Sequence, residues 1–555
     1  MPKSSRRKLA PYLCAFDSED DGQATPFLFC FVHEGGTCHR KTAGEALETL
    51  YDLQRRVLGR GFYVEAWATN LEYDLNNLFG PDRIAEVTLR FGKSHLISAR
   101  WRGIEFRDTV RHVPASVKEL GQQFGMPKLG RDKSVAYCMR DARITYRAAR
   151  ELKRIYRSLG IEPKTTLAST AYRLWETVYF KRRPIETRSE IVRDAREGYH
   201  GGRTEPFSVG VFERVHVIDA ASMFPWAMVA GPFPECWGPV ERAARGSEPD
   251  LLGIYRARVT IRPELGIPPL PFRTAEGTVY PVGQWSGWYT GLELRYAAGL
   301  GHGVRVLGGY RFGKSCKPFT RYVPDLFQRK NAARGPLRLL YKLLLNGLYG
   351  KFGQGGSRVQ ATPLARFDKL RRIPTDVRVW NGLAIYRVDA RPPYWGNNVW
   401  AAIVTARARV RLHQEMEHLR TTGSRVLYCD TDSVIYQAPK GKRPRYPERA
   451  TEPGQFESRG RFRALIIVGK KEYALERSPG KWDVHVKGVP FAERMRYLTE
   501  GSATFQRPVR LLESGRIGIR ANVWRTVSKQ RHVSYEKRIR KADGSLGPVQ
   551  IEPGS

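Results

Sequence analysis

The stretch RVLYCDTDSVIYQ, residues 425 to 437, has the pattern of a β-strand with two carboxylates in its middle. Asp430 and Asp432 stand two positions apart, between apolar and aromatic flanks. Residues spaced by two on a strand project from the same face, and Thr431 and Ser433 suit a tight turn. A buried carboxylate is unfavourable unless it is paired or binds a cation. The stretch therefore indicates either a turn with structural aspartates or part of a metal site.

A second apolar run, VHVIDAASMFPWAM, also ends in a carboxylate, Asp219. A turn of small residues follows it, and then Phe224. Acidic residues from two strand ends suit hard divalent cations, which prefer oxygen ligands. Two such ions roughly 3.5–4 Å apart can activate one oxygen and stabilise the leaving oxygen in phosphoryl transfer.

A third segment, RLLYKLLLNGLYGKF, lies in a helix that we expect over residues 336 to 350. Positions i, i+4, i+8 and i+11 of this segment share one helix face. They are Arg338, Lys342, Asn346 and Tyr349. A lysine beside an amide and an aromatic ring could hold a nucleotide triphosphate, and Lys330 could approach from a preceding helix. A solvated basic stripe is the alternative interpretation.

The composition indicates a polyanionic partner. The 555 residues include 94 Lys and Arg against 55 Asp and Glu, so the net charge is +39. A globular chain this basic usually acts on a polyanion, although a salty or hot habitat or Arg-rich coding would also raise the charge. The 41% hydrophobic content suits several packed lobes.

Membrane and secretory roles are not expected. The sequence has no apolar run of membrane-spanning length and no apolar core behind its basic N-terminus, and its seven cysteines form no C-x-x-C pair. We therefore expect a cytoplasmic protein with free thiols.

The order of elements along the chain predicts an α+β fold, because the strands are separated by helices and by long intervening segments. We expect a hairpin over 9–33, helices over 134–159 and 165–180, a strand ending at Asp219, a Pro/Gly-rich region over 231–290, an irregular basic segment over 353–395 and a helix over 398–420.

Taken together, DAASMFP, KLLLNGLYG and YCDTDS resemble, in this order, motifs A, B and C of the family B DNA polymerases. Lys471 and Tyr473 resemble the family's K-x-Y element, which touches the primer, and VKGVP at 486 to 490 resembles the passage into its thumb. Two positions depart from the family pattern, since Phe224 stands where Tyr is more frequent and Gly347 where Ser is usual.

This resemblance implies a right-hand fold with palm, fingers and thumb that adds dNTPs to the 3′-OH of primer–template DNA. It implies two ions of Mg²⁺ or Mn²⁺ per active site, with Asp219 and Asp432 as main ligands and Asp430 in support. The side chains that it assigns to the incoming nucleotide are Lys330, Lys342, Asn346, Tyr349 and Phe224, the last under the sugar.

Further carboxylates occur upstream at close spacing. FDSEDDG places Asp17 and Glu19 on one strand face, NLEYD places Asp74 four residues after Asn70, and YCMRD places Tyr137 and Asp141 one helical turn apart. Each pattern alone is common in turns and on helix surfaces. In this order they resemble the three motifs of proofreading 3′–5′ exonucleases, which implies an RNase H-like domain.

The exonuclease resemblance also implies roles. The four carboxylates Asp17, Glu19, Asp74 and Asp141 would bind two metal ions, and Tyr137 would orient the attacking water. RHVPASVKELGQQFG, residues 111 to 125, resembles a segment that binds the primer end, with Ser116 at its polar position. Asn70 is a further candidate for DNA contact.

The Y-x-G-G at Tyr199, Gly201 and Gly202 resembles a motif that protein-primed phage and plasmid polymerases carry between their two domains. Those enzymes also have insertions between motifs A and B and between B and C, for which residues 232–325 and 353–395 leave room. The first would contact a terminal protein, and the second would encircle the template and help to unwind it.

Several alternatives stay open: an ordinary primer-extending family B enzyme, a metal-dependent nuclease whose polymerase half only binds DNA, and a basic nucleic-acid binder without activity. We expect a monomer in phage or plasmid replication within a bacterial or archaeal cell. The predicted division is an exonuclease domain at 1–165, connecting helices at 166–205, palm at 206–325 and 396–475, fingers at 326–352, an insertion at 353–395 and a thumb at 476–555.

Overall fold

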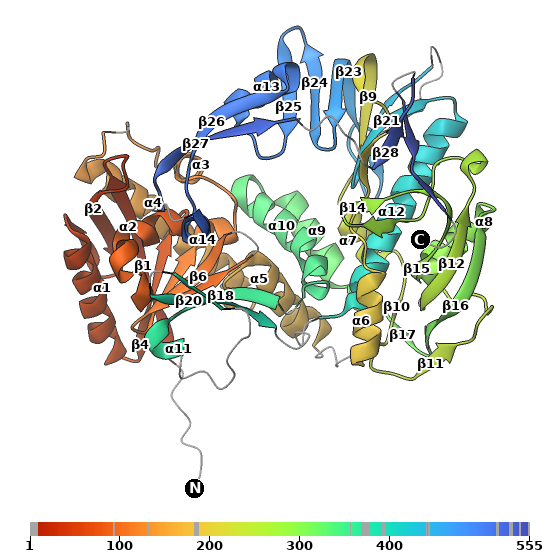
Figure 1. The fold of residues 1–555 in the computed structure, drawn as a ribbon. Helices are drawn as coiled ribbons and strands as arrows, with labels where there is room; N and C mark the ends of the chain where they lie inside the picture. The colour runs from red at the N-terminus through yellow and green to blue at the C-terminus, as the bar shows by residue number, and fades with distance from the viewer. Residues whose placement is uncertain are drawn as a thin grey trace.

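The computed structural model describes residues 9–92, 95–130, 132–181, 188–355, 357–367, 377–380, 382–389, 396–439, 441, 444–517, 521–531, 537–542 and 545–552. Figure 1 shows an N-terminal lobe in red and orange and a second lobe in yellow, green and cyan. Helices α5, α9 and α10 lie between the two lobes, and the C-terminal blue segments join them from above.

The N-terminal lobe is built on the predicted hairpin, which is confirmed as β1 (Ala10–Asp20) and β2 (Pro26–His33). Strand β4 (Phe62–Ala68) pairs in parallel with β1, and β7 (Ile104–Asp108) pairs in parallel with β4. The lobe also contains β3 (Gly36–Arg40), α1 (Ala43–Leu58), α2 (Leu71–Arg83), β5 (Thr88–Phe91), β6 (Leu96–Trp101) and α3 (Val117–Gln123).

Helix α4 (Val135–Ser158) matches the helix predicted over 134–159. Ser134 caps its start, because the Ser134 hydroxyl accepts a hydrogen bond from the backbone N–H of Tyr137. This start places Tyr137 and Asp141 on the buried face, against β1.

The segment between motifs B and C was predicted to be irregular, and this prediction is wrong. It forms β18 (Ser357–Pro363), α11 (Leu364–Phe367), β19 (Val377–Trp380) and β20 (Leu383–Asp389), and residues 356, 368–376, 381 and 390–395 of the predicted insertion lie outside the described part. Strand β18 pairs with β5, so one ten-stranded sheet runs from the N-terminal lobe into the insertion. Ala361 and Leu383 join the core of that lobe, and this burial by distant segments stabilises the strands.

The palm is a seven-stranded sheet in the order β25-β24-β23-β9-β22-β21-β8. Its strands are β8 (Thr204–Pro206), β9 (Gly210–Ala220), β21 (Arg425–Asp430), β22 (Ser433–Gln437), β23 (Phe456–Gly469), β24 (Glu472–Ser478) and β25 (Lys481–Val486). Helix α12 (Asn398–Thr421) confirms the helix predicted over 398–420 and is buried along most of its length.

Four helices connect the palm to the N-terminal lobe. They are α5 (Leu167–Leu174), which a π-helix (Trp175–Phe180) continues, α9 (Tyr322–Ala332), α10 (Gly335–Phe352) and, packed against α9, α10 and α12, the short palm helix α7 (Met223–Val229). A further helix, α6 (Ser189–Glu197), packs against α12. Aromatic rings fill the space among these elements, with Trp400 packed edge-on against Trp175 and Phe352.

The Pro/Gly-rich region and the residues after it form a separate small sheet of β11 (Val240–Ala243), β12 (Ile254–Ile261), β15 (Val282–Thr290) and β16 (Gly303–Phe312), and α8 (Gly291–Gly299) packs against β15 and β16. The chain returns to this sheet at its end, where β30 (Gln550–Ile551) pairs with β15. The smaller paired strands are β10 (Phe233–Pro234), β13 (Phe272–Thr274), β14 (Gly277–Val279), β17 (Ser315–Cys316), β28 (Arg538–Arg540) and β29 (Leu546–Pro548).

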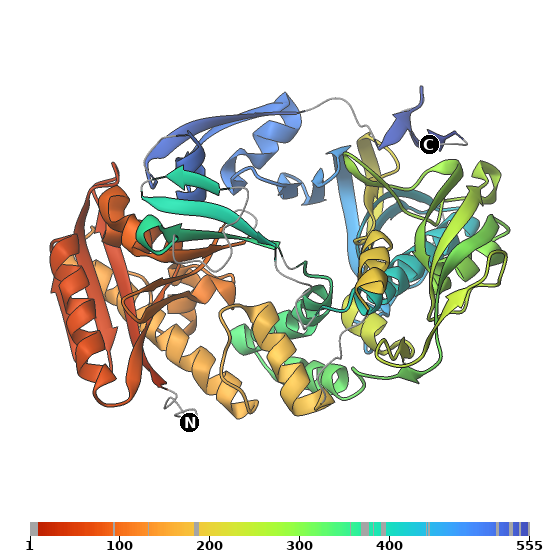
Figure 2. The ribbon, with the colours of Figure 1, turned by 60° about the horizontal axis from the view of Figure 1, so that its bottom comes forward.

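The thumb consists of α13 (Arg494–Glu500) and the ribbon of β26 (Ser502–Pro508) and β27 (Trp524–Gln530), with α14 (Leu511–Ile517) at its tip. Figures 1 and 2 show that the tip reaches the N-terminal lobe. Leu511, Leu512 and Ala521 are buried in the core of that lobe, so the chain closes on itself through its thumb.

Two other predictions concern the whole chain. All seven cysteines are free thiols, as expected, and five of them are buried. Among the described residues, no helix is both long enough and apolar enough to span a membrane.

Candidate active sites

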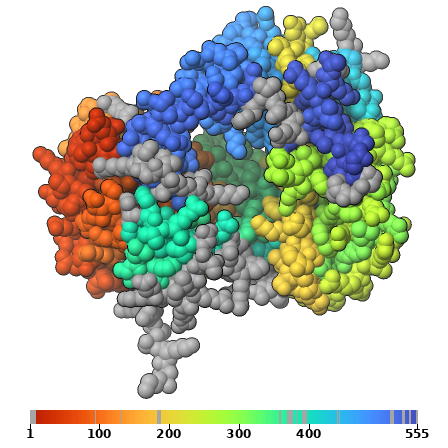
Figure 3. Space-filling model, viewed as in Figure 1, coloured from red at the N-terminus to blue at the C-terminus, as the bar shows by residue number. Residues whose placement is uncertain are grey.

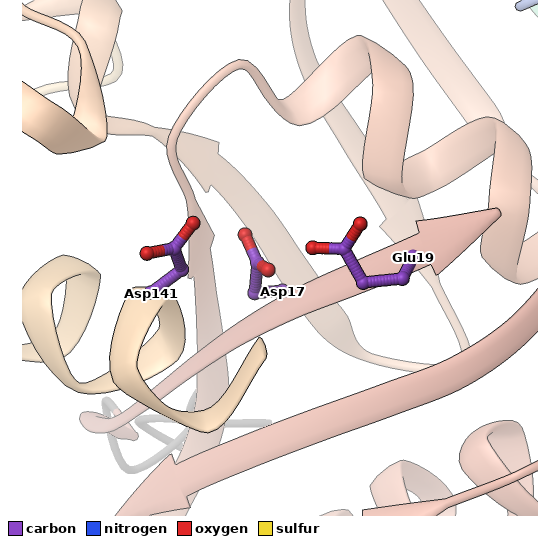
Figure 4. A group of neighbouring side chains, drawn as sticks. All are labelled: Asp17, Glu19 and Asp141. Atoms are coloured by element: carbon purple, nitrogen blue, oxygen red, sulfur yellow. The ribbon is translucent and has the colours of Figure 1, made fainter. Parts of the chain in front are cut away.

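The first site lies in the N-terminal lobe, where three carboxylates converge (Figure 4). Asp17 and Glu19 project from β1 and Asp141 from α4, and one oxygen of each lies within 4.8 Å of the others. Burial, followed by the charges of Asp74, Asp141 and Glu19, holds the pKa of Asp17 well above its usual range. A divalent cation would relieve this repulsion, so the donor set fits such an ion.

The fourth predicted ligand, Asp74 on α2, lines the same cavity of about 800 Å³. Its oxygen Oδ1 accepts hydrogen bonds from the backbone N–H of Ser18 (2.9 Å) and from the Ser18 hydroxyl (2.7 Å). Asp74 is not part of the compact group of three, but its charge acts directly on Asp17.

A lysine that sequence reasoning missed completes this site. The ammonium of Lys128 lies 2.5 Å from Asp141 Oδ2 and 4.8 Å from the ring centroid of Tyr137. Burial opposes its charge, but hydrogen bonds to Asp141 and Tyr137 raise the pKa of Lys128 above its ordinary value. No spacing in the sequence marks Lys128, because it reaches the site from a loop.

The two predicted DNA-contact residues of this lobe have structural positions. Ser116 caps α3 in a capping box with Glu119 and also lines the cavity. Asn70 precedes α2 with a left-handed backbone (φ 71°), and its N–H donates to Asp108.

The second site lies in the palm, at one end of the sheet. Asp219 is on β9, directly opposite Ser433 of β22 and Glu457 of β23. Asp430 is the last residue of β21, and Asp432 lies in the two-residue turn that begins at Thr431, whose φ is 62°. The expectation that both aspartates project from one strand face is therefore wrong for Asp432. A tight hairpin turn, and not strand alternation, brings it to Asp219.

Electrostatics link these palm carboxylates. Burial, then the charges of Asp219 and Asp430, raises the pKa of Asp432 to about 7. Burial also raises the pKa of Asp219, although Arg459 opposes this by donating a hydrogen bond to Asp219 (2.8 Å). The donor set thus fits divalent cations as well.

Lys471 and Tyr473 were predicted to contact the primer. The ammonium of Lys471 lies 2.6 Å from both carboxylate oxygens of Asp430. The ring of Tyr473 stacks on His485 at 4.6 Å and tilts against Tyr428. Arg459 and Glu457, which lie beside Asp219, were missed because they come from a strand with no marked pattern.

The predicted nucleotide-binding lysines meet at the palm. The charge of Lys342 on α10 acts on both Asp219 and Asp432. Lys330 on α9 donates to the Ser222 hydroxyl (3.3 Å), and burial, then the charges of Arg338 and Lys342, lowers its pKa to about 8.

The aromatic residues of motifs A and B also come together. Phe224 and Tyr349 stack with ring centroids 4.1 Å apart and an interplanar angle of 16°. Asn346 and Gly347 are half-buried on the same helix, α10.

The Y-x-G-G segment supports the acidic turn. An added Cβ at Gly202 would lie 2.8 Å from Thr431 Cγ2, so the two backbones approach closely. The backbone N–H of Thr431 donates to the carbonyl of Arg203 (2.6 Å), and the Thr204 hydroxyl donates to Asp430 (2.9 Å). Tyr199 packs against Gly353 at the end of α10.

Comparison with known proteins shows what this chain is similar to. The family model described as DNA polymerase type B, organellar and viral, matches residues 127–362. This match spans less than half of the 555 residues, and over it the chain is similar to the type B DNA polymerases. The matched residues include Tyr137, Asp141, Asp219 and Lys342.

The individual relatives are about one quarter identical to this chain over the matched residues. A probable DNA polymerase of Podospora anserina is 25% identical over 367 residues, which cover 58% of this chain and 29% of that protein. The DNA-directed DNA polymerase of Enterobacteria phage PRD1 is 25% identical over 312 residues, 53% of this chain and 52% of that protein. The chain thus spans about half or less of the length of these curated relatives.

The fold is that of a solved DNA polymerase. Phi29 DNA polymerase, in complex with primer–template DNA and incoming nucleotide, superposes with a TM-score of 0.72 at 16% identity. The match covers 96% of this chain and all of the phi29 chain. The α+β architecture with exonuclease, palm, fingers and thumb is therefore confirmed.

Proposed function

We propose that this chain is a DNA-directed DNA polymerase that extends the 3′-OH of a primer on a DNA template. The observation that carries the proposal is the meeting of Asp219 and Asp432 with Lys342 at the end of the palm sheet. Acidic ligands for divalent cations and a cation for the triphosphate are the two parts that phosphoryl transfer needs.

In this proposal, Asp219 and Asp432 hold two ions of Mg²⁺ or Mn²⁺, and Asp430 supports them. When bound, these ions supply Lewis acidity to the attacking and leaving oxygens. Lys342 and Lys330 bind the triphosphate, and the stacked pair of Phe224 and Tyr349 forms the floor of the nucleotide pocket. The positions of Arg459 and Lys471 against the carboxylates suggest side chains that exchange partners when cations bind.

We also propose a 3′–5′ exonuclease in the N-terminal lobe. Asp17, Glu19 and Asp141 would hold the metal ions together with Asp74. Tyr137 would orient the attacking water, and Lys128 would fix both Tyr137 and Asp141. The proposed domain division keeps the predicted boundaries, except that strands β18, β19 and β20 join the sheet of the N-terminal lobe.

A single assay tests both activities. With a 5′-labelled primer–template, the wild type should extend the primer when dNTPs are present and shorten it when they are absent. Asp432→Ala should lose extension and keep shortening, whereas Asp17→Ala with Glu19→Ala should do the reverse. Extension by Asp432→Ala at the wild-type rate would contradict the assignment of the palm site. Absence of shortening by the wild type would contradict the exonuclease.

We further propose that initiation uses a terminal protein as primer. The support is the Y-x-G-G segment between the two sites and the two insertions, which here are a small sheet and an extension of the exonuclease sheet. Extension through a downstream duplex tests the second insertion. Replacing its exposed Arg378 and Arg387 by alanine should slow displacement while copying of a single-stranded template continues. Equal displacement by the variant would favour an ordinary primer-extending enzyme.

A further inference from the structure

The tip of the thumb binds the helix that carries an exonuclease carboxylate. The segment around α14 and residues 521–522 contacts α2, on which Asp74 lies. The backbone N–H of Leu511 donates to Glu72 Oε1 (2.8 Å), and Asn76 donates to the carbonyl of Ala521 (3.2 Å). Figure 1 shows α14 beside the red and orange lobe, more than four hundred residues away in sequence.

One contact in this interface leads to the catalytic site. The side-chain amide of Asn522 donates to Asn77 Oδ1 (3.0 Å), and the amide of Asn77 donates to the Ser18 hydroxyl (3.1 Å). The Ser18 hydroxyl in turn donates to Asp74 Oδ1 (2.7 Å). Three hydrogen bonds therefore connect the thumb tip to Asp74.

The residues of this hydrogen-bond chain are buried, and each one donates to the next, from the thumb tip toward Asp74. Ser18, Asp74, Asn77 and Asn522 are each at most 5% exposed, so water does not compete for their polar atoms. Asn77 uses its oxygen toward the thumb and its nitrogen toward Ser18, which leaves Ser18 one proton to donate to Asp74.

The location of Ser18 explains why Asp74 depends on it. Strand β4 pairs with β1 only as far as Ala15, so the N–H of Ser18 is free to bind Asp74. Both bonds from Ser18 end on Oδ1, which leaves Oδ2 of Asp74 for a cation.

We propose that Asn522, acting through Asn77 and Ser18, positions Asp74 and makes the exonuclease dependent on a docked thumb tip. Asn77 and Asn522 are positioning residues in this scheme, since neither touches the reacting atoms. The inference rests on the proposed exonuclease activity. Its consequence is that an undocked thumb leaves Asp74 without its fixed orientation, which weakens metal binding at the exonuclease site and leaves the palm site unaffected.

The test compares variants at two positions in the chain of bonds. Asn522→Gly removes the side chain and suits the left-handed backbone there (φ 67°), and Asn77→Ala removes the middle link. Each should slow 3′-end degradation by about 10- to 100-fold and raise the Mg²⁺ concentration needed for half-maximal rate, which is the usual effect of losing a residue behind a metal ligand. The double variant should be no slower than the worse single variant, because both break one path.

Asn76→Ala is the matched control. Asn76 lies on the same helix and binds the same thumb segment, but it takes no part in the bonds that lead to Asp74. It should keep the wild-type exonuclease rate and Mg²⁺ requirement. Mn²⁺ binding to full-length protein with Asp219→Asn and Asp432→Asn, measured by calorimetry, gives a readout that does not depend on activity. There Asn77→Ala should weaken binding and Asn76→Ala should not.

Three outcomes decide between the explanations. Equal losses in Asn76→Ala and Asn77→Ala would overturn the positioning role and leave only thumb docking. An unchanged Mg²⁺ requirement in Asn522→Gly and Asn77→Ala would also overturn it. Absence of degradation by the wild type would instead contradict the proposed exonuclease itself. If Asn77→Ala does not fold, Asn522→Gly alone decides, with primer extension as the measure of intact protein.

Discussion

Replacing Gly202 by alanine should impair primer extension and spare the exonuclease. A Cβ at Gly202 would lie 2.8 Å from Thr431 Cγ2, 3.1 Å from Oγ1 and 3.3 Å from Cβ. Rotation of the Thr431 side chain cannot relieve all three contacts, because its Cβ stays in place. Thr431 is also held by its backbone N–H, which donates to the carbonyl of Arg203 at 2.6 Å. The turn that carries Asp432 must therefore shift.

The size of the effect follows from the overlap. Overpacking a fixed site costs about 1–3 kcal/mol, and about 1.4 kcal/mol corresponds to a tenfold change in rate. We therefore expect a loss of about 10- to 100-fold in single-nucleotide incorporation under single-turnover conditions. Degradation of single-stranded DNA in the same preparation should stay at the wild-type rate, since the exonuclease site lies in the other lobe.

The neighbouring glycine supplies the control. An added Cβ at Gly201 would meet no atom within 4 Å, and neither glycine has a left-handed backbone. Gly201→Ala should thus extend primers within about twofold of the wild type, because about 0.4 kcal/mol is the corresponding limit. Normal extension by Gly202→Ala, or an equal loss in Gly201→Ala, would refute the reasoning that this glycine shapes the acidic turn.

Four further predictions follow from the structure and the charge. Phe224→Val should raise the use of ribonucleotides relative to deoxyribonucleotides by about tenfold or more, because removing a clash of about 1.4 kcal/mol between the ring and the ribose 2′-OH is worth tenfold. Phe224→Tyr should change this ratio little. An unchanged ratio for Phe224→Val in single-nucleotide incorporation would show that Phe224 does not exclude ribonucleotides. The pKa of Lys330 is lowered to about 8, so its charge is lost as the pH rises through 8 and the KM for dNTPs should rise from pH 7 to 9. In Lys330→Arg the KM should change less over this pH range. The same change of KM with pH in the variant and the wild type would exclude triphosphate binding by Lys330. Gly347→Ala should raise the free energy of unfolding by about 0.5–1 kcal/mol, because the new methyl group would lie at an ordinary contact distance of 3.6 Å from Leu167; a lower midpoint in urea would contradict this. DNA binding should weaken steeply with salt, with a log–log slope of several units, because the net charge of +39 displaces counterions from phosphates; a flat response would show that the charge serves another purpose.

Much of the grouping of side chains in the proposed sites could be predicted because it depends on short spacings. Two carboxylates two apart on β1 and a tyrosine four residues before Asp141 on α4 are local patterns, and a strand or helix converts them directly into neighbours. The same logic was incomplete at Asp432, because the tight turn that Thr431 and Ser433 indicated places Asp432 outside the strand. Hairpin turns of this kind depend on a left-handed residue, here Thr431, which is not a residue type that favours that backbone.

The sequence by itself determined which side chains are acidic, basic or aromatic, and which of them are neighbours within one element. It also determined the excess of positive charge and the positions of the long helices, because these properties depend on composition and on periodicity within a short window. Tertiary structure alone decided that Asp219 meets Asp432, because β9 pairs with β22 across more than two hundred residues. It alone placed Lys128 on Asp141, the strands of residues 357–389 on the exonuclease sheet, and Asn522 behind Asp74. Distant segments pair in the arrangement that buries the most apolar surface over the whole chain. A pattern within a short window of sequence does not report that total.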